Sequence, residues 1–297
     1  MILPWLPPGH TAVLPGRGEV FYRHHQHVDR TAPTLLLLHG WTASADLQFF
    51  TAYEGLAEHF SFIAIDHRGH GRGLRGVDTF ELEDCADDAA MLAKQLGIEK
   101  VILVGYSMGG PIALLLTRGH PEMVAGIVVQ ATALEWRSTL AERVRWKTVR
   151  LLGPILRSWA FPSWLRAGMR KLAVDQPKLN PFVEWFAGEM SRNSAVHLVS
   201  AGHALSRFDA KPWADSLGKP AAMLITTKDR LVKPAKQRAL AAALHAHVEE
   251  LPEDHLVTLM KPDEYAAATV RLVQHVAAAD AYSSVGSVPA TISPLSA

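Results

Sequence analysis

A serine in a tight, glycine-bounded turn is the residue of this chain best placed to do chemistry. Ser107 stands in Gly105–Gly109 (Gly-Tyr-Ser-Met-Gly), between the apolar run 101–104 and a helix-compatible stretch that begins at Pro111. This is the G-x-S-x-G pattern with a buried strand before it and a helix after it. The two glycines relieve clashes in a strained turn and leave the serine exposed at its tip. The pattern predicts a nucleophile, although a helix-capping serine would fit the same residues.

A serine hydroxyl needs a base at neutral pH, and the base needs an orienting carboxylate. Asp229 and His255 are the candidates, because they follow the predicted buried strands 221–226 and 247–251. The carboxyl ends of parallel strands meet at one edge of a sheet, where Ser107 would also lie. An ordinary loop carboxylate and a surface histidine are the alternatives. The chain order Ser, Asp, His and the shared placement at strand ends favour a catalytic site.

The sequence His39-Gly40-Trp41 ends an earlier apolar run, 34–38. Gly40 lets the backbone approach a ligand closely. The backbone N–H groups of Trp41 and Met108 are the candidates for the donors that stabilise an oxyanion. We interpret His39 as a residue that organises this turn.

Short, continuous apolar runs separated by helical stretches predict an α/β fold with a mostly parallel central sheet and helices on both faces. Residues 1–17 are expected to be an irregular lead-in. The predicted helices include 82–97 and 262–279, and the predicted strands are 19–25, 34–38, 61–65, 101–104, 124–130, 221–226 and 247–251.

Residues 132–208 interrupt this alternation and predict a helical lid inserted into the core. The segment contains five of the eight tryptophans, and its first half is rich in arginine and lysine. An insertion of this kind belongs over the carboxyl ends of the strands. The expected organisation is therefore a core of residues 1–131 and 209–280, the lid, and a disordered tail at 281–297.

The basic helices of the lid have two interpretations. Arg143, Lys147 and Arg150 have helical spacing, and Trp146 could anchor at an interface, which would give weak contact with an anionic membrane surface. A solvated charged face over a packed lid is the interpretation that we favour.

Composition excludes several classes of protein. The net charge of +1 gives no general attraction to nucleic acid, and the 15 histidines show no metal-ligand spacing. Cys85 is the single cysteine, so the chain cannot form an internal disulfide. Residues 1–16 lack the pattern of a signal peptide, and no apolar run is long enough to span a membrane. We expect a cytoplasmic protein that needs no metal or organic cofactor.

Taken together, these motifs resemble the α/β-hydrolase family, in its lidded branch of esterases, lipases and C–C bond hydrolases. The resemblance covers about residues 19–279 and includes Asp66–Gly71 (Asp-His-Arg-Gly-His-Gly), a chiefly structural motif in the family. It implies that Ser107 is the nucleophile, His255 the base and Asp229 the acid. One departure is Asp254, which stands where the family often has glycine and puts a second carboxylate beside the histidine.

The predicted function is hydrolysis of carboxylic esters, with small or acyl-chain, lipid-like substrates, through an acyl-enzyme on Ser107. Hydrolysis of a C–C bond in a dienoic acid from aromatic or steroid breakdown is an alternative, and it would need a cationic lid residue near the serine. Cofactor-free haloperoxidase or perhydrolase activity and acyl transfer would use the same residues. A non-catalytic ligand-binding module is the interpretation that the sequence favours least. Acyl chain length, pathway and oligomeric state do not follow from the sequence.

Overall fold

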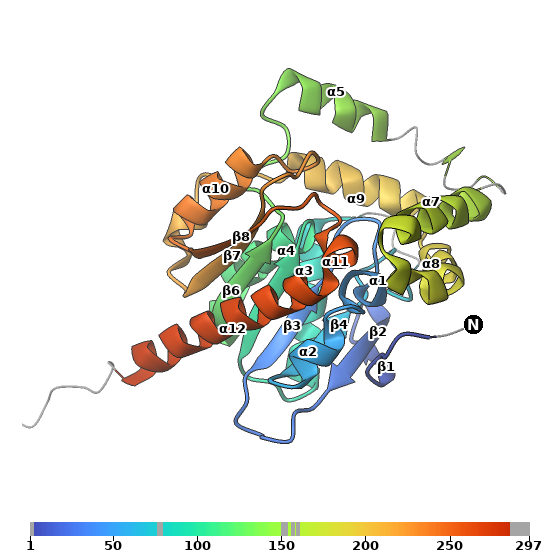
Figure 1. Cartoon of the computed structure of the whole chain (residues 1–297). Coiled ribbons are helices and arrows are strands. Elements are labelled where there is room, and N and C mark those ends of the chain that lie inside the picture. The colour runs from blue at the N-terminus through green and yellow to red at the C-terminus, as the bar shows by residue number, and fades with distance from the viewer. Residues whose placement is uncertain (1–2, 76–79, 150–153, 156–157, 159–160, 286–297) are drawn as a thin grey trace, which may run out of the picture.

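Eight strands form one sheet at the centre of the computed structural model: β1 (Gly9–Leu14), β2 (Gly18–His25), β3 (Thr34–Leu38), β4 (Ser61–Ile65), β5 (Val101–Tyr106), β6 (Val124–Gln130), β7 (Ala221–Thr226) and β8 (His247–Leu251). Their order is β1-β2-β4-β3-β5-β6-β7-β8 (Figure 1). The strands β3 to β8 pair in parallel, whereas β2 pairs antiparallel with both β1 and β4. The structure describes residues 3–75, 80–149, 154–155, 158 and 161–285.

The seven predicted strands and the mostly parallel sheet are confirmed, but the irregular lead-in is wrong at one place. Residues Gly9–Leu14 form β1, which pairs with β2 from Gly9 opposite Arg23 to Leu14 opposite Gly18. Most residues of β1 are exposed or half-buried. This strand is held by hydrogen bonds to a neighbour rather than by an apolar face, so its own residues carry little strand signal.

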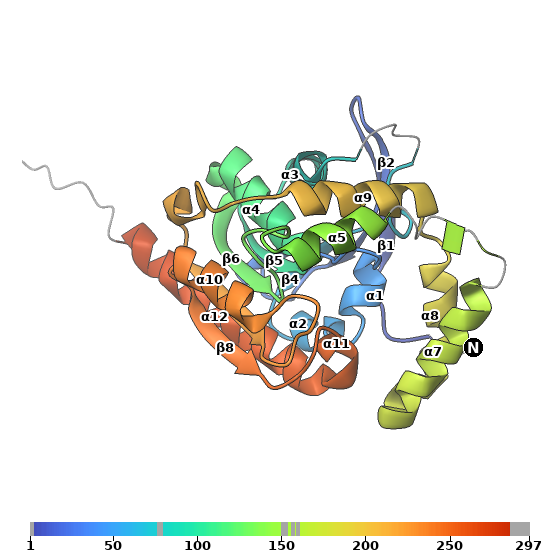
Figure 2. The ribbon, with the colours of Figure 1, turned by 90° about the horizontal axis from the view of Figure 1, so that it is seen from above.

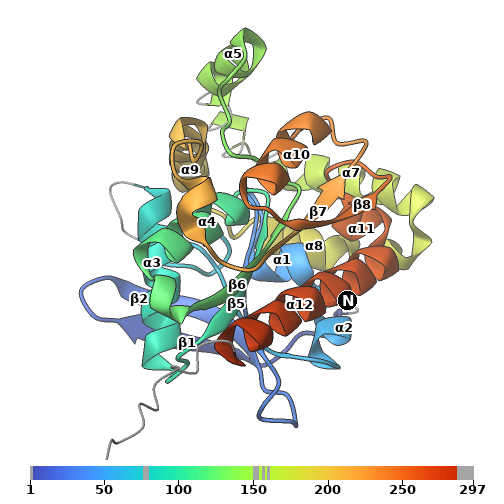
Figure 3. The same ribbon diagram turned by 90° about the vertical axis from the view of Figure 1, so that its left-hand side faces the viewer.

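Helices cover both faces of the sheet, as predicted. Along β3, Leu36 and Leu38 face one side, whereas Leu35 and Leu37 face the other. The first side is covered by α3 (Leu82–Gln95) and α4 (Gly109–Gly119), and the second by α2 (Tyr53–Ala57) and α12 (Pro262–Val285), as Figure 3 shows. Three further helices follow strands at the other edge of the core: α1 (Ala45–Phe49), α10 (Pro234–Ala243) and α11 (Val257–Met260).

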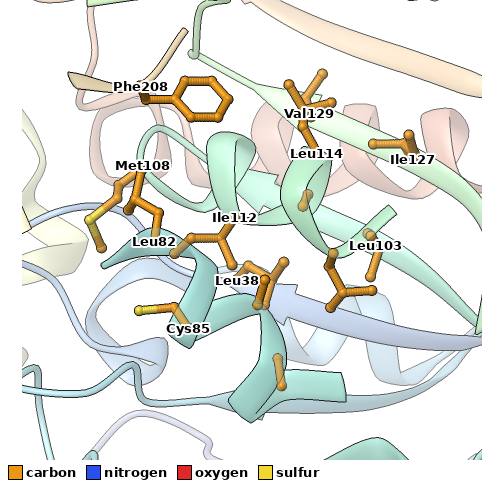
Figure 4. Packing of buried hydrophobic residues seen from close by; sticks show 14 of the residues in the cluster. Leu38, Leu82, Cys85, Leu103, Met108, Ile112, Leu114, Ile127, Val129 and Phe208 are labelled. Carbon is orange, nitrogen blue, oxygen red and sulfur yellow. The ribbon is translucent and has the colours of Figure 1, made fainter. Parts of the chain in front are cut away.

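The cluster on the first side holds the serine turn in place from below. Figure 4 shows side chains of the central strands, including Leu38 and Leu103, beside Ile112 of α4 and Leu82 of α3. Cys85 lies in the same cluster and is fully buried, and burial raises the pKa of its thiol well above the ordinary value. Cys85 is therefore a core residue and not a nucleophile.

Between β6 and β7 the chain forms the helices α5 (Leu140–Thr148), α7 (Phe161–Asp175), α8 (Val183–Met190) and α9 (Ala195–Arg207), with short 3₁₀ turns at Pro177–Phe182 and Ala214–Leu217. We call residues 131–220 the β6–β7 segment. Seen from above, α5 and α9 cross over the strands (Figure 2). The function of this segment as a lid stays a prediction.

Two expectations about the helices need correction. Trp146 is 7% exposed, and its indole N–H donates to the Trp136 carbonyl at 2.6 Å. It therefore packs inward and cannot anchor at a membrane surface, while Arg150 lies outside the described residues. At the other end, α12 continues to Val285, so the expected tail begins inside a helix, and residues 286–297 lie outside the described part. Within the described residues, no helix has the length and apolarity that crossing a membrane requires.

Candidate active site

The strand β5 turns into α4 through Ser107, whose backbone is in the left-handed region with φ 51°. A side chain on Gly105 would collide with the carbonyl of Gly109, and one on Gly109 would collide with the carbonyl of Leu38. Both glycines are thus required by packing, as the sequence predicts. The Ser107 N–H donates to the Gln130 carbonyl at 2.9 Å, which ties the strained turn to β6.

The three residues singled out at strand ends meet in space. The Oγ of Ser107 lies 3.0 Å from Nε2 of His255, and Nδ1 of His255 lies 2.8 Å from Oδ2 of Asp229. Ser107 and Asp229 are buried, with 6% and 3% of their surfaces exposed. This is the geometry in which a carboxylate orients an imidazole that accepts a proton from a hydroxyl.

The carboxylate of Asp229 accepts four hydrogen bonds besides that from the histidine. Its Oδ1 takes the backbone N–H groups of Leu231 and Val232, both at 2.8 Å. Its Oδ2 takes the Thr226 hydroxyl at 2.8 Å and the Gln237 amide at 3.1 Å. Sequence reasoning missed Thr226 and Gln237. Five donors fix both oxygens, so the carboxylate can neither rotate nor lower its charge on another group.

A further residue that the sequence did not indicate is Tyr106, next to the serine. Its hydroxyl donates to the backbone carbonyl of His255 at 2.7 Å. Burial raises the pKa of Tyr106 well above its usual value, so the phenol stays neutral and remains a donor. Tyr106 therefore fixes the loop that carries the histidine from the strand that carries the serine.

The second carboxylate beside the histidine has a different task. The Oδ2 of Asp254 lies 2.6 Å from Nε of Arg230, and its Oδ1 accepts the backbone N–H groups of Arg230 and His255. Burial works against ionisation of Asp254, but these hydrogen bonds and the guanidinium outweigh it and lower the pKa. The carboxylate is thus bound to the loop backbone, and it does not orient the imidazole, whose Nδ1 is bonded to Asp229.

The predicted oxyanion donors lie where a strand end approaches the serine. The space that a Cβ on Gly40 would occupy is 3.2 Å from Cβ of Ser107, so only glycine allows this approach. Among the described residues, neither the Trp41 nor the Met108 backbone N–H donates to a protein acceptor. Two unpaired amides beside a serine are what a developing oxyanion requires. Their role stays a prediction.

The histidines of the two turns are structural. His39 is fully buried, its Nδ1 is bonded to the Gly40 carbonyl at 2.8 Å, and its Nε2 accepts the His67 backbone N–H at 2.9 Å. The Asp66 carboxylate accepts the backbone N–H groups of Ala45 and Arg72, both at 2.8 Å. These contacts bind the two turns to each other, which agrees with the interpretation of His39 as a turn-organising residue.

A cavity of about 500 Å³ contains Ser107 and His255 in its wall. The rest of its lining is mostly apolar and comes from the oxyanion turn, the β6–β7 segment and α11, including Trp41, Trp136, Trp146, Phe186, Leu205 and Leu259. Three of the five tryptophans of the segment, including Trp185, are buried, Trp164 is exposed and Trp159 lies outside the described residues. The cavity has the size and character of a small-molecule site.

Residues 33–262 match the family described as alpha/beta hydrolase fold. Over 277 residues, the chain is 26% identical to a protein of Agrobacterium fabrum provisionally named carbamate hydrolase RutD, covering 86% of this chain and 97% of that one. It is 25% identical over 211 residues to 3-oxoadipate enol-lactonase 2 of Acinetobacter baylyi, covering 70% of this chain and 76% of that one. An esterase structure from Exiguobacterium antarcticum, 19% identical, shares the fold with a TM-score of 0.75, covering 90% of this chain and all of that one, 100%.

Proposed function

The chain belongs to the alpha/beta hydrolase fold family, and from this premise we propose that it is a serine hydrolase that cleaves carboxylic esters through an acyl-enzyme on Ser107. The observation that carries the proposal is the pair of hydrogen bonds at His255, 3.0 Å to the Ser107 hydroxyl and 2.8 Å to the Asp229 carboxylate. A helix-capping serine would need neither of these partners.

In the proposed reaction, His255 accepts the proton of Ser107 while Oγ attacks the carbonyl carbon of the ester. The N–H groups of Trp41 and Met108 stabilise the negative charge that develops on the carbonyl oxygen. His255 then protonates the departing alcohol, which leaves the acyl group on Ser107. The same histidine next takes a proton from water, the hydroxide attacks the acyl carbon, and the acid leaves with the serine restored.

The cavity supports substrates of limited size with an apolar body. Its volume of about 500 Å³ and its aromatic lining suit short and medium acyl chains. Lactones are cyclic esters and would react at the same serine, and one relative carries the name enol-lactonase. They therefore belong in the first substrate panel.

The decisive experiment compares the wild type with Ser107→Ala on p-nitrophenyl esters from acetate to palmitate and on a lactone panel. We expect turnover that falls by at least about a thousandfold in the variant. A fluorophosphonate should add its mass to the wild type and not to Ser107→Ala. Ser200→Ala is the matched control, because Ser200 lies on α9 outside the cavity lining.

Two results would overturn the proposal. One is ester turnover that survives in Ser107→Ala, which would place the chemistry on another residue. The other is a folded wild type that neither turns over any ester or lactone nor reacts with the fluorophosphonate, which would favour a C–C bond hydrolase or a binding role.

A further inference from the structure

One permanently charged side chain lies in the wall of an otherwise mostly apolar cavity. Arg145 of α5 lines the same cavity as Ser107, and among the described lining residues it alone carries a charge that does not depend on pH. His255 is the other titratable cation there, and it is bonded to Asp229. A guanidinium in this place is a potential partner for a group on the substrate.

The guanidinium of Arg145 has no acidic partner among the residues that the structure describes. No carboxylate lies within ion-pair distance of it, and its one side-chain hydrogen bond runs from Nη1 to the Leu231 carbonyl at 3.4 Å, longer than an ordinary N–H···O bond. The acidic residue on the same helix, Glu142, is bonded to Lys236 at 2.7 Å. Most donors of Arg145 are therefore free for a ligand.

An aromatic platform limits where the guanidinium can go. Its carbon atom lies 5.7 Å from the ring centroid of Trp146, within the range of a cation–π contact. Trp146 is itself buried, its indole N–H is bonded to the Trp136 carbonyl, and its ring lies 5.7 Å from that of Trp41. The platform keeps Arg145 at the cavity even though its side chain is exposed.

We propose that Arg145 is an anion subsite of this cavity and that it selects esters whose acyl part ends in a carboxylate. The proposal rests on the proposed function, because the subsite acts on the same substrate as Ser107. The apolar walls would hold the carbon chain, and the guanidinium would bind the terminal carboxylate through two parallel hydrogen bonds. Lysine could not replace it, since one ammonium cannot form this paired contact.

The test compares substrates that differ in one end group. Mono-p-nitrophenyl adipate and p-nitrophenyl hexanoate have the same chain, with a carboxylate or a methyl group at its end, and the suberate and octanoate esters form a longer pair. Shorter diacid monoesters are avoided, because their carboxylates attack the ester internally. The measured quantity is the ratio of kcat/KM for the anionic ester to that for the neutral ester.

We expect Arg145→Gln to lower this ratio about tenfold for the chain length that reaches the subsite. Lys147→Gln removes the same charge from the same helix, but Lys147 is exposed and does not line the cavity, so its ratio should equal that of the wild type. Added salt should weaken the preference for the anionic ester in the wild type and not in Arg145→Gln. An equal ratio in the wild type and Arg145→Gln, or an equal fall in Lys147→Gln, would overturn the subsite.

A binding measurement separates this proposal from the proposed function. In Ser107→Ala, calorimetry would compare adipic acid monoanilide, which carries the carboxylate, with hexananilide, which does not. Tighter binding of the anionic amide that is lost in the Ser107→Ala, Arg145→Gln double variant supports the subsite even if no ester is hydrolysed. Equal binding of the two amides overturns it even if the esterase activity is present.

Discussion

The two parts of the β6–β7 segment that border the cavity are attached to the core by different kinds of contact. The turn from α8 to α9 is bound to the core by buried contacts: Glu189, 4% exposed, pairs with Arg72, and the Asn193 amide donates to the Thr42 carbonyl at 2.9 Å. By contrast, α5 is bound mainly through Lys236, which pairs with Glu142 at 2.7 Å at the rim of the molecule. Figures 1 and 3 show α5 farther from the sheet than α9.

This difference separates two tasks. The indole N–H of Trp41 donates to the Leu198 carbonyl of α9 at 2.7 Å, and Thr42, bound by Asn193, has a left-handed backbone with φ 67°. The α8–α9 part therefore fixes the strained turn that presents the proposed oxyanion donors. The α5 part carries Trp146 and Arg145, which shape the cavity. Catalytic geometry thus depends on the firmly attached part, whereas substrate choice depends on the part that is more weakly attached.

Removing one carboxylate from each attachment tests the comparison. Glu189→Gln leaves the buried Arg72 with a weaker partner, so we expect the free energy of unfolding to fall by about 2 kcal/mol. Glu142→Gln removes a half-exposed ion pair, and glutamine still caps the helix, so we expect a loss below about 1 kcal/mol. Urea unfolding at pH 7 measures both. Equal losses would show that the two attachments do not differ in strength.

Acid should affect the core beside the oxyanion turn before it affects α5. Burial lowers the pKa of His67 to about 3 and that of His70 to about 4. Unfolding exposes both to water, so below pH 6.5 the unfolded chain binds more protons and stability is lost as the pH falls. Burial acts oppositely on Asp66, raising its pKa to about 7, so its protonation favours the folded chain as the pH falls. His39, whose pKa burial also lowers, adds a third group to the histidine side, which therefore dominates.

The size of this effect can be isolated at His67, because neither ring nitrogen has a hydrogen-bond partner. His67→Phe should reduce the pH dependence of the free energy of unfolding, between pH 5.5 and 4, by about 1.4 kcal/mol per pH unit. His247→Gln, at an exposed histidine, is the control and should change nothing. The ion pair of Glu142 lasts longer: burial opposes its ionisation, yet the hydrogen bond from Lys236 prevails and lowers its pKa to about 2. Its contribution is present above pH 4.5 and is lost toward pH 2. An unchanged slope in His67→Phe would show that the buried histidines do not govern acid stability.

The sequence predicted those parts of the fold and site that depend on local pattern. Ser107, Asp229 and His255 could be found because each follows a buried strand, and parallel strands bring such positions to one edge. Gln237 and Tyr106 could not be found in this way. Gln237 is one polar residue on a helix and reaches Asp229 only in the folded chain, and Tyr106 meets His255 149 positions away. β1 was missed for the same reason, since its partner strand and not its own residues makes it a strand.

The smallest expected effect concerns Gln48, a third residue of this kind, which belongs to α1 and lines the cavity. Its Oε1 accepts the Gly40 N–H at 3.3 Å, and the position of a Cβ on Gly40 would be 3.0 Å from that oxygen and 3.2 Å from Cβ of Ser107. Gln48 is therefore a positioning residue for the turn that carries the proposed oxyanion donors. Gln48→Leu removes the acceptor and should lower kcat about tenfold on the best ester.

The KM of Gln48→Leu should stay near that of the wild type, because an oxyanion forms only in the transition state and ground-state binding does not use these donors. Gln48→Glu keeps an acceptor for Gly40 at nearly the same shape, so it should restore most of the lost kcat. A Gln48→Leu enzyme with a raised KM and an unchanged kcat would assign Gln48 to substrate binding instead. In that case the oxyanion turn would be held by α9 alone, which would make the contrast between the α8–α9 part and α5 sharper still.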